Sequence, residues 1–248
     1  ANCLWGNCAA IKVEGRNFKL TLRRVFINNT VIGLLSDNRG GQIVMEDSVI
    51  QNTGLNDTST TLGHGFYAGD IDRVVMKNSI IRRSFSKGHL FKSRAAETEI
   101  IHSVIAGLDG RPSRVIDFPC GGKLTVTNSV LQQGKWTDNI DLISVGTEPQ
   151  NCGGSVPPSD VTVKDNWIIF EREDTPDEPA ANHGFTRMFT WRAPVGSIEV
   201  TGNRIVDRTG RFQYDGEGKL PATFDGNYFY KTRQESGFKV DQLEDLSN

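Results

Sequence analysis

Apolar and polar residues alternate in short segments that recur along most of the chain. Each segment reads apolar, any, apolar, two polar residues, Ser or Asn, any, apolar, and eight copies begin at residues 20, 43, 74, 98, 124, 161, 198 and 222. A period of two is typical of β-strands rather than helices. The polar break before the Ser or Asn predicts a bend between two strands.

The spacing of these copies predicts a solenoid. Successive copies lie 23, 31, 24, 26, 37, 37 and 24 residues apart, which indicates a coil of about 24 residues with occasional insertions. Such a unit buries its apolar face only by stacking on the next copy. We therefore expect one domain with about eight coils in residues 17–231, an N-terminal segment or cap in 1–16, and a polar tail in 232–248.

Stacking in register at about 4.8 Å predicts columns of like residues. Two columns are aliphatic and are expected to face inward: Leu22, Met45, Met76, Ile100, Val126, Val163, Val200 and Phe224, and Ile27, Ile50, Ile81, Ile105, Leu131, Ile168, Ile205 and Phe229. Between them runs a polar column of Ser48, Ser79, Ser103, Ser129, Asn166, Asn203 and Asn227. A ladder of Ser and Asn at a bend can bond the backbone groups that the turn leaves free.

This repeat resembles the right-handed parallel β-helix of the pectin lyase-like superfamily, whose coils carry such Asn ladders at one turn. The resemblance covers roughly residues 17–231. It implies an all-β fold, a single right-handed parallel β-helix with negligible α-helix. A fold by itself does not define a function.

Composition limits the classes of partner. The chain has 248 residues with 37% hydrophobic and 23% charged residues, which is ordinary for a folded globular protein. The 28 Lys and Arg against 30 Asp and Glu give a net charge of −2, so we expect no nucleic acid partner. No apolar run approaches the roughly 18 to 20 residues of a membrane-spanning helix, and we expect no membrane partner.

The four cysteines form two pairs with similar local sequence. Cys3 and Cys8 each follow an asparagine, and Cys120 and Cys152 each precede two glycines. No CxxC motif supports a metal or redox site. We predict disulfides Cys3–Cys8 and Cys120–Cys152, with free structural thiols as the alternative. Disulfides favour a secreted or periplasmic protein.

A third strand precedes three of the units, in residues 63–69, 88–94 and 112–118. Aligning them predicts an inward column of Phe66, Phe91 and Ile116, an outward column of Tyr67, Lys92 and Asp117, and a third column of His64, His89 and Arg114. Arg94 lies beside them. Asp141 and Ser144 on the following coil suggest that the patch ends there. Only four His and four Tyr occur in the chain, so this concentration points to a site.

We expect acid–base chemistry on an acidic, uronate-containing polysaccharide at this patch. Cations neutralise a uronate carboxylate and so acidify the C5 proton, while a tyrosine or histidine moves that proton. The candidate catalytic residues are His64, Tyr67, His89, Lys92 and Arg94, and the candidate substrate-binding residues are Arg82, Arg83, Arg114 and Asp117. In the lyases and C5-epimerases of the superfamily, Lys, Arg, His and Tyr on a sheet face serve such roles. Replacing Lys92 is then expected to slow the reaction and leave the fold intact.

Other interpretations stay open. The patch can bind carbohydrate without turnover, or it can be structural, because exposed columns of any solenoid are polar. The chain can also be a component of a phage spike or fibre, which would form a homo-oligomer such as a trimer. No cofactor is expected, since only Asp70 and Asp72 favour calcium. The string His183-Gly184-Phe185 repeats residues 64–66 and is interpreted as structural. Each of Trp136, Trp167 and Trp191 either stacks on a sugar or packs against the protein.

Overall fold

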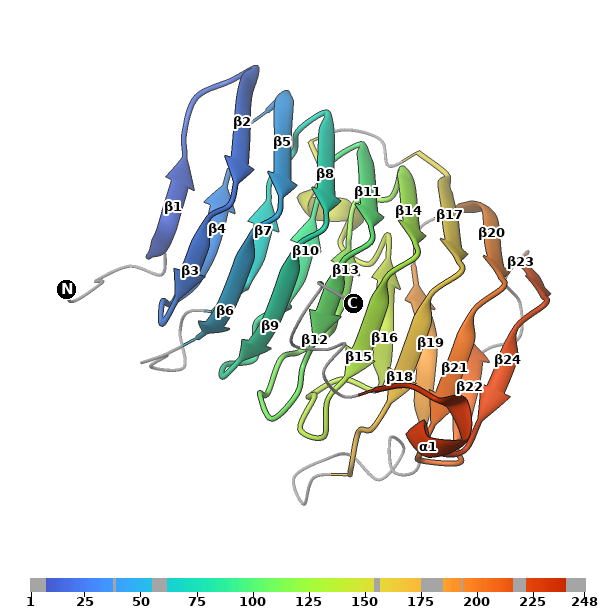
Figure 1. Ribbon diagram of the computed structural model, residues 1–248. Helices are drawn as coiled ribbons and strands as arrows, with labels where there is room; N and C mark the ends of the chain where they lie inside the picture. The colour runs from blue at the N-terminus through green and yellow to red at the C-terminus, as the bar shows by residue number, and fades with distance from the viewer. Residues whose placement is uncertain are drawn as a thin grey trace.

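Each predicted repeat folds into one coil of three short strands, and the coils stack along a single axis (Figure 1). The computed structural model describes residues 8–37, 39–54, 62–153, 157–174, 185–192, 194–215 and 222–239. The result is a right-handed parallel β-helix of about eight coils, as the sequence predicted. Stacking produces three parallel sheets, here called sheets A, B and C, with one strand from every coil in each sheet.

The strands have the following bounds. Sheet A contains β1 (Ala9–Val13), β4 (Ile32–Ser36), β7 (Phe66–Ala68), β10 (Phe91–Ser93), β13 (Ile116–Phe118), β16 (Asp141–Val145), β19 (Thr186–Trp191) and β22 (Phe212–Asp215). Sheet B contains β2 (Phe18–Arg23), β5 (Gly41–Glu46), β8 (Arg73–Lys77), β11 (Glu97–Ile101), β14 (Lys123–Thr127), β17 (Ser159–Lys164), β20 (Val195–Thr201) and β23 (Ala222–Asp225). Sheet C contains β3 (Phe26–Asn28), β6 (Val49–Thr53), β9 (Ile80–Ser84), β12 (Val104–Ala106), β15 (Val130–Gln133), β18 (Trp167–Phe170), β21 (Arg204–Asp207) and β24 (Tyr228–Tyr230).

The register of the sheets confirms the predicted columns. Met45 pairs with Leu22 and Met76 in sheet B, and Ile50 pairs with Ile27 and Ile81 in sheet C. In sheet A the rings of Phe66 and Phe91 stack with centroids 4.8 Å apart. Such columns of like side chains form a continuous core in which each residue contacts its counterpart one coil away.

The bend between sheets B and C repeats one backbone conformation. The residue before the polar ladder has a positive φ in all eight coils, and the column consists of Arg24, Asp47, Asn78, His102, Asn128, Asp165, Gly202 and Gly226. Asn, Asp and Gly tolerate this left-handed region best, which explains the two-residue polar break in the sequence pattern. The ladder residue then accepts from the preceding coil: Ser79 N–H donates to Ser103 Oγ at 3.2 Å.

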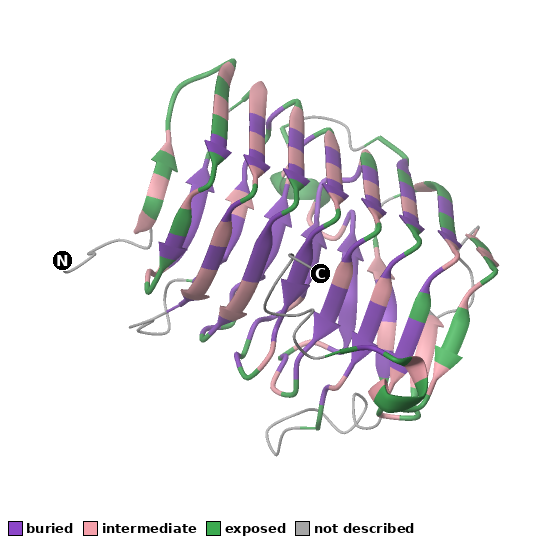
Figure 2. Cartoon of the chain, in the orientation of Figure 1, coloured by how far each residue is buried: buried purple, intermediate pink, exposed green. Residues whose placement is uncertain are grey.

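Burial is highest in the middle coils and falls toward both ends (Figure 2). Phe91, Ile116 and Ile143 of sheet A are fully buried. In the last described coil, Phe229 occupies an inward column but is 53% exposed. The site described below lies in the middle coils, where neighbouring coils fix the backbone on both sides.

The two ends differ in detail from the predicted boundaries. The first coil begins at Ala9, since β1 pairs with β4, so part of the segment expected as a cap is a strand. After β24 the chain forms the short helix α1 (Arg233–Ser236) and folds back on sheet C. There Phe238 packs against Trp167, with ring centroids 5.1 Å apart, in a small apolar cluster outside the main core. The tail is therefore partly packed up to the last described residue.

One of the two predicted disulfides is present. Cys120 and Cys152 are bonded, with Cα atoms 5.6 Å apart. The Cys3–Cys8 pairing involves residues 1–7, outside the described residues. Besides α1, the described chain forms one 3-10 turn, η1 (Pro149–Asn151), and neither is long and apolar enough to cross a membrane.

The Asn ladder gives a test of the stacking. Asn203 Oδ1 accepts from Asn166 N–H at 2.9 Å, and its amide donates to Val163 O at 2.9 Å. Asn203→Ala leaves both backbone groups buried without a partner and should lower the free energy of unfolding by about 2 to 4 kcal/mol. Asn203→Ser should lose less, because Ser103 Oγ takes the same N–H bond in another coil. Equal urea midpoints for the alanine variant and the wild type would refute the role of the ladder.

Candidate functional site

The site lies on the outer face of sheet A, where the predicted register is correct. Lys92 on β10 pairs with Tyr67 on β7 and with Asp117 on β13. His64 and His89 each precede their strand by two residues, and their rings lie stacked with centroids 5.4 Å apart. Stacking in register thus brings side chains that are 25 residues apart in sequence to adjacent rungs.

Lys92 and Asp117 form a buried ion pair rather than the exposed column that we expected. Lys92 Nζ lies 2.7 Å from Asp117 Oδ2, and the two side chains are only 6% and 1% exposed. Ser144, one coil further, donates its hydroxyl to Asp117 Oδ1. The patch therefore does not end before that coil, because Ser144 completes the bonding of the buried carboxylate.

Glu148 is the residue that sequence reasoning missed. It lies in the loop 146–153, and its Oε1 is 2.7 Å from Lys92 Nζ while its Oε2 contacts the guanidinium of Arg94. The loop is held by backbone bonds from Gly146 and Glu148 to the preceding coil and by the disulfide at Cys152. This loop covers Lys92. A signal was available, since the predicted Cys120–Cys152 bond brings residue 148 next to that coil.

Tyr67 and Arg94 are the candidates that face open space. Arg94 Nε donates to the Tyr67 hydroxyl at 3.0 Å, and both side chains line a cavity of about 470 Å³. A second cavity of about 650 Å³ shares Tyr67 and extends across Leu35 to Lys12 on β1. The two cavities form a groove that crosses the coils on sheet A. A chain-like ligand in that groove would pass over the Tyr67 hydroxyl.

The two histidines are buried and neutral. Burial lowers the pKa of His64 well below its ordinary value, and the neighbouring His89 and the positive charge of Lys92 lower it further. Burial also lowers the pKa of His89 to about 4, although Asp117 opposes the shift. His64 Nδ1 accepts from the His89 backbone N–H at 2.9 Å, so the proton of neutral His64 is on Nε2.

His89 has the same tautomer for a different reason. Its Nε2 lies 3.2 Å from Asp117 Oδ2 and therefore carries the proton. Its Nδ1 has no hydrogen-bond partner among the described residues. Burial disfavours the charged form of Asp117, but His89, Lys92 and Ser144 outweigh that effect and hold the pKa of Asp117 well below its usual range.

Arg114, Arg82 and Arg83 do not join this cluster. Arg114 shares the column of His89, but its Nη2 is 3.0 Å from Asn139 Oδ1 and 3.4 Å from Asp141 Oδ2. Arg82 and Arg83 are on β9 in sheet C. Because a coil turns between the sheets, side chains close in sequence face different sides of the solenoid.

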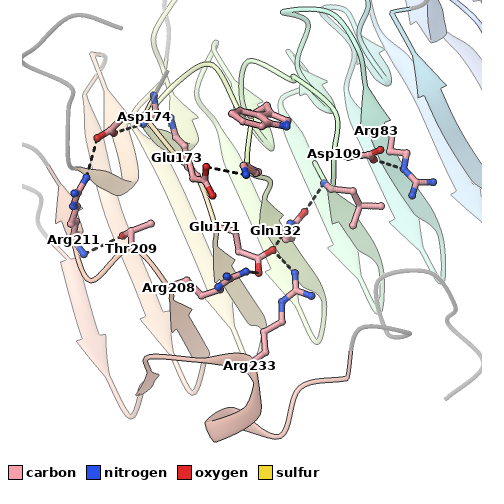
Figure 3. Close-up of a pocket in the computed structure, with 14 residues that line it drawn as sticks. Arg83, Asp109, Gln132, Glu171, Glu173, Asp174, Arg208, Thr209, Arg211 and Arg233 are labelled. Carbon is pink, nitrogen blue, oxygen red and sulfur yellow. Dashed lines mark hydrogen bonds and ion pairs between the residues drawn. The ribbon is translucent and has the colours of Figure 1, made fainter. Parts of the chain in front are cut away.

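Arg83 instead lines a separate cavity of about 630 Å³ beside sheet C (Figure 3). The carboxylates and cations that line this cavity pair with one another. Glu171 contacts Arg208 and Arg233, Asp174 contacts Arg172 and Arg211, Glu173 contacts Lys135, and Asp109 contacts Arg83. Every cation among its described lining residues thus has a carboxylate. Trp136 also lines the cavity, and Lys135 Nζ lies 4.6 Å from its ring centroid. The described lining has six cations against four carboxylates, and it contains no tyrosine beside an arginine like Tyr67 beside Arg94.

Of the remaining candidates, Asp70 lines the same cavity as Tyr67 and Arg94. Asp72 accepts from Gly41 N–H at 2.8 Å, and Asp70 is 4.0 Å from Arg39. Within the described ranges, no three His, Cys, Asp or Glu side chains gather in a way that could hold a metal. Trp167 packs under Phe238, Trp191 packs on the main core, and His183 lies outside the described residues.

No protein-family model, curated protein or solved structure matches this chain.

The buried histidines predict a loss of stability in mild acid. Folded His89, with a pKa of about 4, stays neutral where the unfolded residue, near 6.5, takes a proton, so its stabilising contribution is present above pH 6.5 and falls as the pH drops toward 4. Between pH 7 and pH 5 this costs about 2 kcal/mol. Asp117 and Glu148, whose pKa values are lowered, lose their contribution only below about pH 4.5. Urea unfolding of His89→Gln should show a smaller loss over pH 7 to 5, and an unchanged loss would contradict the assignment.

Lys92 is expected to be a stability residue as well. Lys92→Met leaves the Asp117 carboxylate buried without its cation, which should lower the free energy of unfolding by about 3 to 5 kcal/mol. Our sequence-based expectation that the fold tolerates this change is thus revised, because Lys92 is buried. Lys87→Met, which removes an exposed lysine 3.0 Å from Asp138, is the control and should change little. Equal unfolding free energies for the two variants would contradict the buried pair.

Proposed function

We propose that this protein acts on an acidic, uronate-containing polysaccharide that lies in the groove across sheet A. The observation that carries the proposal is that Lys92 and Arg94 both form ion pairs with a single carboxylate, that of Glu148. An ammonium and a guanidinium on one carboxylate form charge-assisted bonds of the kind that recognise a uronate. The Tyr67 hydroxyl, 3.0 Å from Arg94 Nε, lies beside this pair and is open to the groove.

The chemistry that this arrangement supports is removal of the proton at C5 of the uronate. That proton is α to the carboxylate, and its loss places negative charge on the carboxylate oxygens. Lys92 and Arg94 would stabilise this charge, and their partial burial strengthens the effect. The Tyr67 hydroxyl lies 3.0 Å from Arg94 Nε and lines the groove, so Tyr67 is the proposed base.

After the C5 proton is removed, the intermediate can react in two ways. In β-elimination the C4–O4 bond breaks, a C4–C5 double bond forms, and a proton goes to the leaving oxygen. In C5 epimerisation the proton returns to C5 from the opposite face. The returning proton would come from water in the groove. His64, buried with its ring 5.3 Å from that of Tyr67, would position Tyr67 rather than donate, because a neutral imidazole that lost its Nε2 proton would become an imidazolate. His89 and Asp117, which are buried below, would position His64 and Lys92.

The resemblance of the repeat to the pectin lyase-like superfamily supports this assignment, since members of that superfamily include lyases and C5-epimerases. The Cys120–Cys152 disulfide supports a secreted or periplasmic location, where such polymers occur and disulfides persist. Neither observation selects a particular polymer.

The second candidate is a β-helix that binds glycans without turnover, such as a component of a phage spike or fibre. The observation that favours it is the charge balance of the cluster: Lys92 and Arg94 face Asp117 and Glu148, and both histidines are neutral. A neutral cluster suits binding or structure as well as catalysis. Turnover separates the two candidates.

The proposed reaction predicts exchange of the C5 proton with solvent. Incubation of uronate polysaccharides in D₂O should introduce deuterium at C5 or give an unsaturated product that absorbs in the ultraviolet. Tyr67→Phe should lower the rate by about 10² to 10⁴, because the proposed base loses its hydroxyl. The fold should be retained, since Tyr67 lies at the groove.

Tyr228→Phe is the matched control, because Tyr228 is an exposed tyrosine on sheet C, away from the groove. Its rate should equal that of the wild type. Full activity of Tyr67→Phe would exclude Tyr67 as the base. Tight binding of a uronate polymer with no deuterium and no unsaturated product would favour the glycan-binding candidate.

A further inference from the structure

Glu148 occupies the place where the proposed function puts the substrate carboxylate. Its two oxygens contact different cations, Oε1 with Lys92 and Oε2 with Arg94. The side chains of Lys92 and Arg94 are only 6% and 11% exposed, whereas that of Glu148 is 28% exposed and forms the outer surface of the cluster. Arg94 lines the groove cavity but Lys92 does not, so a carboxylate arriving from the groove can reach Arg94 and has to displace Glu148 to reach Lys92.

The backbone around Glu148 is fixed, so the side chain stays close to the cations. Glu148 N–H donates to Pro119 O at 3.1 Å, and Gly146 N–H donates to Phe118 O at 2.8 Å. Four residues after Glu148, Cys152 is bonded to Cys120. The loop continues along the groove, where Gln150 and Asn151 line the same cavity as Tyr67 and Arg94. The far end of the loop is thus held against the coils as well.

We propose that Glu148 is an intramolecular competitor that holds the Lys92–Arg94 site until the carboxylate of a uronate chain displaces it. The inference rests on the proposed function, since it names a uronate carboxylate as the displacing group. Displacement requires only rotation of the Glu148 side chain, because its backbone bonds do not involve the carboxylate. A competitor tied to the site acts at a high effective concentration.

Competition of this kind weakens the binding of every ligand that has to displace Glu148, and by the same factor. The affinity of a ligand falls in proportion to the small fraction of molecules in which Glu148 has moved away. A short uronate offers one carboxylate and few other contacts, and so it binds poorly. A longer chain also contacts the groove beyond Tyr67, toward Leu35 and Lys12, and compensates for the displacement. In the wild type, therefore, a chain needs these additional contacts to bind tightly, although Glu148 leaves the ratio of affinities between long and short chains unchanged.

The key variant is Glu148→Gln, which keeps the size of the side chain and removes its charge. The matched control is Glu173→Gln, because Glu173 also pairs with a lysine, Lys135 at 3.1 Å, but lines the cavity beside sheet C. The ligands are trisaccharides and longer chains of galacturonate, mannuronate and glucuronate, with the methyl esters of the trisaccharides as ligands that lack the charged group. Calorimetry gives the dissociation constants.

We expect Glu148→Gln to bind a uronate trisaccharide about 10- to 100-fold more tightly than the wild type, the range that corresponds to an open fraction of a few per cent. Its gain for the longest chains should be of the same size, while turnover of those chains is retained. The methyl ester should gain no affinity, and Glu173→Gln should match the wild type. Equal or weaker binding of the trisaccharide by Glu148→Gln, or loss of turnover, would overturn the inference.

A second readout separates this inference from the proposed function. The rate at which acetic anhydride modifies Lys92, followed by peptide mass spectrometry, reports how well Glu148 covers the amine without any uronate. Glu148→Gln should raise this rate at least several-fold, and Glu173→Gln should not. A raised modification rate with no uronate binding in either protein would support the claim that Glu148 shields Lys92 and would overturn the claim that a uronate is the ligand. An unchanged modification rate would overturn the claim that Glu148 shields Lys92, whatever the result of the polysaccharide assays.

Discussion

In-register stacking of parallel strands is the constraint on which the rest of this structure depends. Each coil adds one strand to each of three sheets, so every position acquires a counterpart about 4.8 Å above and below. Apolar positions become continuous columns such as that of Met45 and Met76, and bends become ladders such as that of Asn166 and Asn203. A polar residue at an inward position needs a polar partner inside the core, as Thr98 has in Ser93, whose Oγ lies 2.8 Å from Thr98 Oγ1.

The same constraint builds the candidate site. Tyr67, Lys92 and Asp117 are brought together only because their strands are paired in register, and the stacked Phe66 and Phe91 fix those strands from inside. Asp117 holds Lys92 from below through a buried ion pair. Since the coils are rigid, the one part of the site that can change at low cost is the covering side chain of Glu148. Recognition would then depend on how well a ligand replaces one carboxylate with another.

The repeat made most of the fold predictable from the sequence. The period of two and the spacing near 24 residues fixed which residues share a column, and the shared Cys-Gly-Gly strings pointed to the Cys120–Cys152 bond. The packed Phe238 was not predictable, because a single aromatic residue in a polar tail carries no period.

The site was predictable in its columns but not in its burial. Register predicts which residues are neighbours along a sheet. Burial also depends on the loops inserted between strands, and the loop with Glu148, which covers Lys92, has no counterpart in the other coils. Arg82 and Arg83 were expected to bind substrate because they follow the Ile80-Ile81 strand and could line a groove, but the turn of the coil places them on sheet C. Ser144 looked like the end of the patch, although its hydroxyl bonds Asp117.

The central claim is that Lys92 and Arg94 form a binding site for a ligand carboxylate. The most direct measurement is a crystal structure of Glu148→Gln with a bound uronate oligosaccharide. The account predicts a carboxylate within about 3 Å of both Lys92 Nζ and the Arg94 guanidinium, with the sugar ring next to the Tyr67 hydroxyl and the chain along sheet A. An oligosaccharide bound beside Trp136 on the sheet C side, with the Lys92–Arg94 pair unoccupied, would contradict it.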